Sequence, residues 1–426
     1  MTEEIKARIE SIRKGEVPNG YNEGVAGILP NDWTSKPLSE ISEVISEQAG
    51  DDDYETLSIS AGIGFVNQAQ KFGKELSGKQ YEKYTVLRKG DFAYNKGNSK
   101  LYPQGCTYRL KERDEAAVPN VFECFCITEG CPEYYEQLFI SGFMNRQLTR
   151  KINHGVRDDG LLNLTEADFY STVLPVPSFA EQKKIAAILS TCDQVIELNQ
   201  QLLDEKRKQK QWLMKVLLDP DSGVRLPGFE NSKWVKCRLD ELADIYSGGT
   251  PNTNVKSYWN GDILWCTPSD ITSAGKYIDQ TEITISEQGL RKSSAILMPI
   301  GSILMCSRAT IGPRSIAQTP IATNQGFKNF VCKAGLYNEF LYYMLDVILP
   351  DLLKKAAGNT FKEISKSDIA KSTLYVPDLI EQKAIADCLI SADDEIELIN
   401  QELETWKQKK KSLMQLLLTG IIKIGG

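Results

Sequence analysis

The strongest constraint on this chain is an internal repeat at a shift of 200 residues. The segment 176–219 aligns without a gap on the segment 376–419, and 19 of their 44 positions are identical. Both copies open with Val-Pro and carry Glu-Gln-Lys a few residues later. Chance does not give such an agreement, so the chain contains a tandem duplication, and its fold has to be built twice.

A tryptophan stands far upstream of each copy at almost the same distance. Trp33 lies 148 residues before Glu181, and Trp234 lies 147 residues before Glu381. The equal spacing indicates that one long module was duplicated, rather than its last segment alone.

Each repeated segment predicts a long helix. A proline stands just before it, an acidic residue falls in the first turn, and neither glycine nor proline recurs until Pro220 and Gly420. Apolar residues then follow at alternating spacings of three and four, which predicts a heptad seam with a gap at Lys206 and Lys210. Acids are interspersed among the nearby lysines, so we interpret these lysines as a solvated helix surface.

The length of the helices indicates how they pack. A helix of nearly 40 residues is about 60 Å long, more than a globule of about 150 residues can cover. We therefore expect the two helices to form an antiparallel coiled coil, although each could instead cover only its own globule. The residues assigned to the seam and to partner docking are Glu181, Gln182, Leu189, Ile196, Leu203, Leu213, Glu381, Gln382, Leu389, Ile396, Leu403 and Leu413.

The repeat is circularly permuted across the termini. A short helix predicted around Ile9 precedes Trp33 as the end of the first long helix precedes Trp234. We therefore expect pseudo-twofold symmetry, with the first and last residues near each other. The predicted segments are an amino-terminal helix near the carboxy-terminal helices (1–20), a first globule (21–175), a first helical region (176–220), a second globule (221–375) and a second helical region (376–426).

The globules combine short strand-like runs with helical patterns. The apolar runs lie at 84–88, 91–94, 121–127, 263–265, 303–305 and 330–332, and helical patterns follow at 132–151 and 338–355. This mixture predicts an α/β (α+β) fold for each globule.

Composition restricts the function. The charged amino end lacks a signal-peptide pattern and no apolar run could span a bilayer, so we expect a cytoplasmic protein without a membrane partner. The ten cysteines form no CxxC pair, and the single histidine, His154, leaves little imidazole for catalysis. A core position explains the cysteines better than a metal site does, so we expect no metal ligands.

Motifs that resemble catalytic sites are incomplete in this sequence. The stretch 73–80 matches a phosphate-binding loop except that Gln80 replaces the Ser or Thr that would hold magnesium. Pro377-Asp378 and Glu381 resemble a nuclease signature but are too close together to lie on two strands, and helix initiation explains them. The tetrapeptide with which amino-methyltransferases hold a flipped base is absent. We therefore predict a noncatalytic chain without a cofactor of its own.

Basic residues gather in corresponding regions of the two modules. Residues 71–113 hold 11 basic and 4 acidic side chains, and residues 289–328 contain no acid. Cations interleaved with tyrosines suit contacts with phosphates and bases. The predicted DNA-binding residues are Lys71, Lys74, Lys79, Tyr81, Lys83, Lys89, Tyr94, Lys96, Lys100, Thr250, Tyr258, Arg291, Lys292, Arg308, Arg314 and Lys328.

Several motifs together resemble one family. The tryptophan-led modules, the Gly-Gly-Thr-Pro at 248–251 with Tyr-Trp at 258–259, the Tyr-Asn-Lys at 94–96 and the repeated Val-Pro entry to a helix are similar to the DNA-specificity subunit of type I restriction-modification enzymes. The likeness covers essentially the whole chain, but the first module lacks the Gly-Gly-Thr-Pro signature. Base-contact roles therefore do not carry over between modules.

The resemblance implies a division of labour. The globules would be target recognition domains that each read half of a bipartite double-stranded DNA sequence. The helices would set the length of the spacer between the two half-sites and would dock two methyltransferase subunits. Those partners would bring S-adenosylmethionine and methylate adenine N6, and two restriction subunits, where present, would bring ATP- and Mg-dependent cleavage. The alternative is a coiled-coil adaptor whose modules bind protein. The sequence does not reveal the DNA target.

Overall fold

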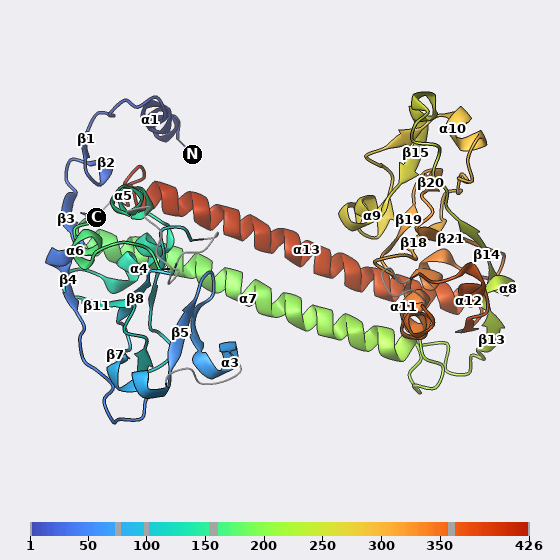
Figure 1. Cartoon of the computed structure of the whole chain (residues 1–426), viewed down its shortest axis with the longest axis horizontal. Coiled ribbons are helices and arrows are strands. Elements are labelled where there is room, and N and C mark those ends of the chain that lie inside the picture. Colours follow the sequence, from blue (N-terminus) through green and yellow to red (C-terminus); the bar gives the residue numbers. More distant parts are fainter. Residues whose placement is uncertain (1, 73–77, 98–101, 153–160, 357–362, 425–426) are drawn as a thin grey trace. The chain divides into compact units, whose positions relative to one another are not determined.

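The computed structural model describes residues 2–72, 78–97, 102–152, 161–356 and 363–424, and it divides into two compact units (Figure 1). Unit 1 comprises residues 1–200 and 401–426, and unit 2 comprises residues 201–400. Each unit therefore holds one globule, the beginning of one long helix and the end of the other.

The globule of unit 1 is built from short strands and helices. Its elements are α1 (Glu3–Arg13), β1 (Tyr21–Gly24), β2 (Gly27–Pro30), β3 (Thr34–Pro37), α2 (Leu38–Ile41), β4 (Ser42–Val44), β5 (Leu57–Ser60), β6 (Gly64–Asn67), α3 (Gln68–Phe72), η1 (Gly78–Lys83), β7 (Thr85–Arg88), β8 (Phe92–Asn95), β9 (Cys106–Arg109), β10 (Glu115–Val118), β11 (Glu123–Ile127), α4 (Pro132–Ile140), α5 (Asn145–Lys151), α6 (Glu166–Tyr170) and β12 (Val173–Val176).

An antiparallel sheet of order β4-β11-β8-β9 forms the centre of this globule. Phe92 of β8 lies opposite Phe125 of β11, and their rings stack with centroids 5.4 Å apart. Phe139 of α4 meets both rings edge-on, which seats this helix on the sheet. The helical pattern predicted over 132–151 is broken into α4 and α5, because Gly142 adopts a φ of +75° that favours glycine.

The globule of unit 2 repeats this plan with additions. Its elements are β13 (Val235–Arg238), α8 (Leu239–Leu242), β14 (Ala243–Ser247), η2 (Lys256–Tyr258), β15 (Trp259–Cys266), α9 (Pro268–Ala274), β16 (Tyr277–Ile278), β17 (Thr284–Ile285), α10 (Glu287–Arg291), β18 (Ile303–Cys306), β19 (Arg314–Ala317), β20 (Ile321–Thr323), β21 (Phe327–Cys332), α11 (Asn338–Lys355), α12 (Lys366–Ala370) and β22 (Thr373–Val376).

The sheet order identifies the shared frame of the two globules. The order β14-β21-β18-β19-β16 in unit 2 matches β4-β11-β8-β9 in unit 1, with β16 added at the edge in parallel to β19. The ladder β13-β22 likewise matches β3-β12. Outside this frame the units differ, since unit 2 has a three-stranded sheet β17-β15-β20 and unit 1 has the pairs β5-β6 and β7-β10. The predicted mixed fold and its duplication are confirmed.

The long helices are α7 (Phe179–Leu217) and α13 (Leu379–Leu417), each of 39 residues as predicted. In unit 1 the start of α7 packs with the end of α13, and Leu189 shares a core with Leu417. In unit 2 the start of α13 packs with the end of α7, and Leu389 shares a core with Leu217. Within each unit the two helices therefore run in opposite directions.

Candidate nucleic-acid interface

The repeated glutamate fastens each globule to the start of a long helix. In unit 1 the indole nitrogen of Trp33 donates to Glu181 at 3.0 Å, and in unit 2 that of Trp234 donates to Glu381 at 3.3 Å. The hydroxyl of Ser232 also donates to Glu381. These contacts explain why the tryptophan and the glutamate recur at nearly equal spacing.

The repeated glutamine joins the same helix start to the next element of the globule. The side-chain oxygen of Gln182 accepts from the backbone N–H of Cys131 at 2.8 Å, and that of Gln382 accepts from Tyr337 at 2.9 Å. Each amide nitrogen donates back to the proline carbonyl that precedes the helix. All four Glu and Gln side chains are buried, so the prediction that they dock partners is corrected, and they hold the module together.

The predicted seam positions differ in burial. Among the predicted positions, Leu189, Leu203, Leu389 and Leu403 are buried. The remaining predicted positions, Ile196, Leu213, Ile396 and Leu413, are half-buried. Within each unit the predicted positions are therefore apolar and at least half-buried.

Lysines fill the gap in the predicted seam. In unit 2 Lys206 pairs with Glu395 of α13 at 2.7 Å, and Lys210 pairs with Asp393. In unit 1 Lys410 pairs with Asp193 of α7 at 2.5 Å. These lysines are therefore contacts between the helices, which corrects their interpretation as a solvated surface.

Residues near the two ends of the chain meet in unit 1. The guanidinium of Arg8 in α1 donates to the carbonyl of Ile421 at 2.5 Å, and the hydroxyl of Tyr21 donates to that of Gly420 at 2.7 Å. Lys423 also pairs with Asp32. The permuted repeat predicts this proximity.

The predicted cations of unit 1 lie at several places on its globule. Lys71 of α3, Lys83 of η1 and Lys89, which follows β7, are exposed, and Lys71 donates to the carbonyl of Ile59 at 3.0 Å. Lys96 is instead drawn into an ion pair with Glu123. Lys74 and Lys100 lie outside the described residues, as does the side chain of Lys79.

Tyr81 has a role inside the globule. Its hydroxyl donates to the carbonyl of Asp52 at 2.6 Å and accepts the backbone N–H of Tyr54 at 2.6 Å. The residue is half-buried, and its hydroxyl secures the loop that contains Asp52 and Tyr54.

Unit 2 presents three exposed predicted cations. Arg291 at the end of α10 pairs with Glu287 at 3.0 Å, and Lys292 follows it. Arg308 lies in the loop between β18 and β19, where the next residue, Ala309, has a φ of +62°. The backbone of Arg308 forms an antiparallel β-bridge with Glu363, and its exposed guanidinium makes a loose ion pair with the same residue at 3.9 Å.

The Gly-Gly-Thr-Pro turn is required for close packing. A Cβ on Gly248 would lie 1.9 Å from the carbonyl oxygen of Asn324, and one on Gly249 would lie 2.3 Å from the backbone nitrogen of Ala295. Thr250 hydrogen-bonds to Gln325. Tyr258, in η2, is half-buried. The glycines of the signature therefore serve the fold of the second globule.

Three predicted DNA contacts are corrected. Tyr94 is 1% exposed, and its hydroxyl donates to a backbone carbonyl at 2.7 Å. Arg314 pairs with Asp346 at 2.6 Å through a side chain that is 6% exposed. Lys328 is also buried, and burial lowers the pKa of its ammonium. These side chains belong to strands of the sheets, so their charge or hydroxyl is used within the globule.

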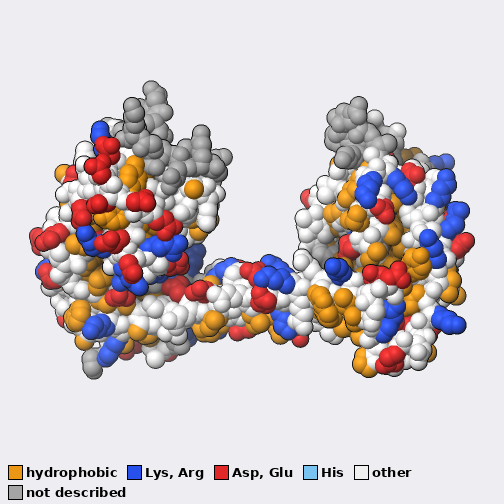
Figure 2. Space-filling model, turned by 90° about the horizontal axis from the view of Figure 1, so that it is seen from below, with side chains coloured by type: hydrophobic (Ala, Val, Ile, Leu, Met, Phe, Trp, Pro, Cys, Tyr) orange, Lys and Arg blue, Asp and Glu red, His pale blue; other side chains and the backbone are white. Residues whose placement is uncertain are grey.

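A hollow of about 280 Å³ in unit 1 also carries basic side chains. Acids neutralise them, because Arg109 pairs with Glu133 at 2.8 Å and Lys111 pairs with Glu136 at 2.7 Å. Figure 2 shows acidic side chains among the basic ones on this globule. The hollow therefore does not have the surplus of positive charge that phosphates require.

Three further properties bear on the class of protein. Within the described ranges, no helix has both the length and the apolar character needed to cross a membrane. In the same part of the chain, no three side chains of the metal-binding types gather as ligands would. All ten cysteines are free thiols.

Two known proteins resemble this chain, one over most of its length and one over part of it. It is 25% identical over 428 residues to the putative type I restriction enzyme MjaX specificity subunit of Methanocaldococcus jannaschii, a match that covers 93% of this chain and 95% of that protein. It is 37% identical to the MjaIX specificity subunit of the same organism over 167 residues, which span only 39% of that relative.

Solved structures share the fold. The crystal structure of a type I restriction-modification S subunit from M. genitalium has a TM-score of 0.56 at 14% identity and covers 94% of this chain and 97% of that one. A chain from a type I system solved to explain its assembly and conformational transition has a TM-score of 0.57 at 19% identity, covering 92% and 99%.

The family match is made twice. The sequence model of the type I restriction modification DNA specificity domain matches residues 30–205 and again residues 231–408. Each matched stretch begins near the tryptophan that binds the repeated glutamate and ends within a long helix. The chain therefore belongs to the family of type I restriction-modification DNA specificity proteins.

Proposed function

We propose that this chain is the DNA-specificity subunit of a type I restriction-modification enzyme and that each globule reads one half of a bipartite target in double-stranded DNA. The observation that carries the proposal is the double match to the specificity domain, with one globule in each matched stretch. The chain itself would be noncatalytic, as the failure of every catalytic motif in its sequence suggests.

The two half-sites should differ in sequence. The globules share one sheet frame, but the elements and loops added to that frame differ between the units. Surfaces of different shape and charge cannot read the same bases in the same way. We therefore propose an asymmetric target.

The proposed DNA contacts are the exposed cations outside the cores. They comprise Lys71, Lys83 and Lys89 in unit 1 and Arg291, Lys292 and Arg308 in unit 2. Arg308 is the best candidate for reading a base, because a guanidinium on a short loop between strands can present two donors to a guanine edge. The lysines suit phosphates, which fix the register of the protein on DNA.

The outward faces of the long helices suit two equivalent partners. Leu198 and Leu398 occupy corresponding positions of the repeat and are 63% and 67% exposed. Large apolar side chains exposed in this way favour a protein interface. We propose that each docks one methyltransferase subunit, which supplies S-adenosylmethionine and methylates adenine N6, and that restriction subunits with ATP and Mg join through them.

The assembly would act in the cytoplasm. Ten free thiols are typical of a reducing compartment. The long helices would set the length of the DNA spacer between the two half-sites.

Methylome sequencing of cells with and without this gene tests the function. The proposal expects one bipartite, asymmetric N6-methyladenine motif that disappears with the gene. If the deletion removes no motif while the methyltransferase partners are still made, the proposal is wrong. An adaptor that binds only protein would give that result.

Binding measurements on the assembled complex test the interface. Arg308→Ala should weaken binding by about 1 to 3 kcal/mol and relax one position of the target. Arg238→Ala is the matched control, because Arg238 is exposed in the same unit but pairs closely with Asp240 at 2.5 Å, whereas Arg308 lies 3.9 Å from Glu363. We expect the control to bind DNA as the wild type does. If Arg308→Ala also binds as the wild type does, Arg308 is not part of the interface.

Native mass spectrometry tests the docking sites. Leu198→Asp and Leu398→Asp should each remove one methyltransferase subunit, and the double variant should remove both. If the double variant still binds two subunits, the docking face lies elsewhere.

A further inference from the structure

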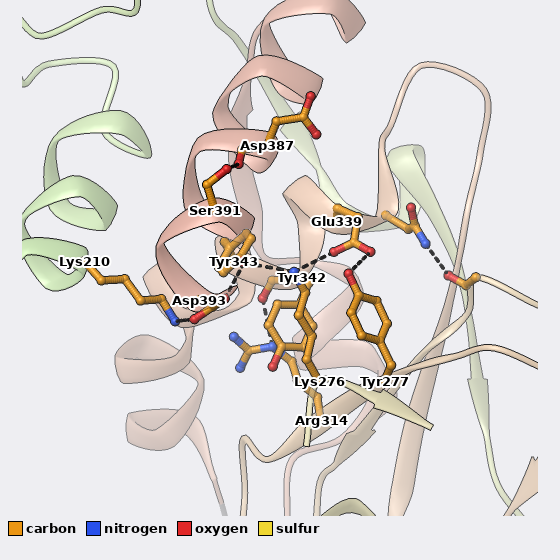
Figure 3. Close-up of polar contacts among 12 residues, drawn as sticks. Lys210, Lys276, Tyr277, Arg314, Glu339, Tyr342, Tyr343, Asp387, Ser391 and Asp393 are labelled. Carbon is orange, nitrogen blue, oxygen red and sulfur yellow. Dashed lines mark hydrogen bonds and ion pairs between the residues drawn. The ribbon is translucent and has the colours of Figure 1, made fainter. Parts of the chain in front are cut away.

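One aspartate in unit 2 is bound by both the globule and the second long helix. The hydroxyl of Tyr343 in α11 donates to Oδ2 of Asp393 in α13 at 2.5 Å (Figure 3). Lys210 of α7 pairs with Oδ1 of the same carboxylate. The two oxygens of Asp393 thus join one globule helix to both long helices.

The equivalent aspartate of unit 1 does the same with different chemistry. Gln137 of α4 donates to Oδ2 of Asp193 in α7 at 2.8 Å, and Lys410 of α13 pairs with Oδ1 at 2.5 Å. Asp193 and Asp393 are equivalent in the repeat. Both units therefore have the same arrangement, in which the phenol of Tyr343 in unit 2 takes the place of the amide of Gln137 in unit 1.

In unit 2 the contacts continue into the globule. The ammonium of Lys276 lies 2.9 Å from the Tyr343 hydroxyl and 2.9 Å from Oε2 of Glu339. The hydroxyl of Tyr277 donates to Oε1 of Glu339 at 2.9 Å. Lys276 directly precedes the edge strand β16, so an unbroken series of polar contacts leads from the central sheet to the long helices (Figure 3).

Unit 1 has a counterpart to this link. Arg109, the last residue of β9, pairs with Glu133 at 2.8 Å. Glu133 is the second residue of α4, as Glu339 is the second residue of α11. In both units an edge strand is therefore tied to the helix that contacts the aspartate.

The partial burial of these groups makes the contacts directional. In unit 2 the side chains of Lys210 and Asp393 are 24% and 27% exposed, and Tyr343 is buried. In unit 1 Lys410 is 11% exposed and Asp193 is 45% exposed, so we expect the larger effect from Asp393. Charge-assisted hydrogen bonds in such surroundings are stronger than surface ion pairs and hold one geometry. Apolar packing alone could attach a globule to the helices, but it would tolerate small rotations.

We propose that Asp193 and Asp393 are positioning residues that fix the orientation of each recognition globule on the long helices and thereby restrict the spacer length that the complex accepts between its two half-sites. The inference rests on the proposed function. It adds residues that do not touch DNA to those that determine which DNA is recognised.

The test uses the full chain assembled with its methyltransferase subunits and its own target from the methylome. Affinity is measured on DNA with the natural spacer, on DNA with the spacer one base pair longer or shorter, and on each half-site alone. The variants are Tyr343→Phe, which removes only the hydroxyl, and Asp393→Asn, with Asp193→Asn as the counterpart in unit 1.

The control is Glu395→Gln. It breaks the ion pair with Lys206, which joins the two long helices in the same unit without a globule helix. We expect the preference for the natural spacer to fall by about tenfold in the variants and to stay as in the wild type in the control. Affinity for a half-site alone should not change.

Each other outcome decides against the inference. If the variants lower the melting temperature but keep the spacer preference, the aspartates serve stability only. If the control loses the preference equally, any contact between the helices would suffice, and the globule contact is not the cause. If the wild-type complex binds no specific sequence, the proposed function itself fails, which separates that failure from the first two.

Discussion

Gly420→Ala should open the junction between the two ends of the chain in unit 1. Gly420 has a φ of +67°, where an L side chain costs about 1 to 2 kcal/mol. An added Cβ would lie 2.5 Å from Cγ of Pro30 and 2.6 Å from its Cδ, whereas relaxed carbon contacts are about 3.5 to 4.0 Å. Overpacking of this kind costs about 1 to 3 kcal/mol, so we expect a total of about 2 to 5 kcal/mol. The hydrogen bond from Tyr21 to the Gly420 carbonyl would be strained with it.

Hydrogen exchange followed by mass spectrometry measures this opening locally. Peptides that cover β1 to β3 should lose protection in Gly420→Ala, while peptides from unit 2 should not change. Gly20→Ala is the matched control, since Gly20 has a φ of +82° but nothing within 4 Å of an added Cβ. It should show only the conformational cost of about 1 to 2 kcal/mol. Equal loss of protection in both variants would show that Gly420 is not packed against Pro30, and the reasoning would be refuted.

Three further predictions concern the module and its helices. Trp33→Phe should destabilise its module by about 1 kcal/mol more than Trp234→Phe, because a serine hydroxyl also donates to the glutamate in unit 2; denaturant unfolding of both variants measures the difference. The hydrogen bond from Lys423, chiefly, lowers the pKa of Asp32, so the stability it adds is present above about pH 3.8 and is lost as the pH falls through the lowered pKa; Asp32→Asn should abolish this acid dependence of exchange at the chain ends. Inserting four residues after Gln201, about 6 Å of helix, should lengthen the methylated motif's spacer by one or two base pairs at about 3.4 Å each and leave both half-sites unchanged; an unchanged spacer in the methylome would mean that the helices do not measure distance.

The duplicated architecture could be predicted because its signals are local or periodic. The helices are uninterrupted and their seam repeats at heptad spacing, so length and direction followed from the sequence. The break at Gly142 is not predictable from the pattern, because a single glycine inside an apolar helical pattern is compatible with a continuous helix. In the structure α4 ends at Ile140 and α5 begins at Asn145, with the left-handed backbone of Gly142 between them.

The candidate site was less predictable because charge in a sequence does not reveal its partner. Arg314 and Lys328 were expected on the surface, but both lie in strands whose neighbours are buried. Asp346 and Glu363, which pair with them, lie 32 and 35 residues further along the chain. Only the fold brings such groups together, so composition overestimates the basic surface. The sequence does show that Asp193 and Asp393 occupy equivalent positions of the repeat, which indicates that they share a role. It does not show which side chains they bind, because those partners lie on other elements.

The charge pattern of the long helices also explains why each pairs in the opposite direction to the other. Because the repeat is displaced by 200 residues, a parallel pairing in register would place Asp193 beside Asp393 and Lys210 beside Lys410. Like charges facing each other across a seam are destabilising. The antiparallel pairing instead brings Lys410 to Asp193 and Lys210 to Asp393. The same four side chains therefore select the direction of the helices and, through the aspartates, provide the points to which the globules attach.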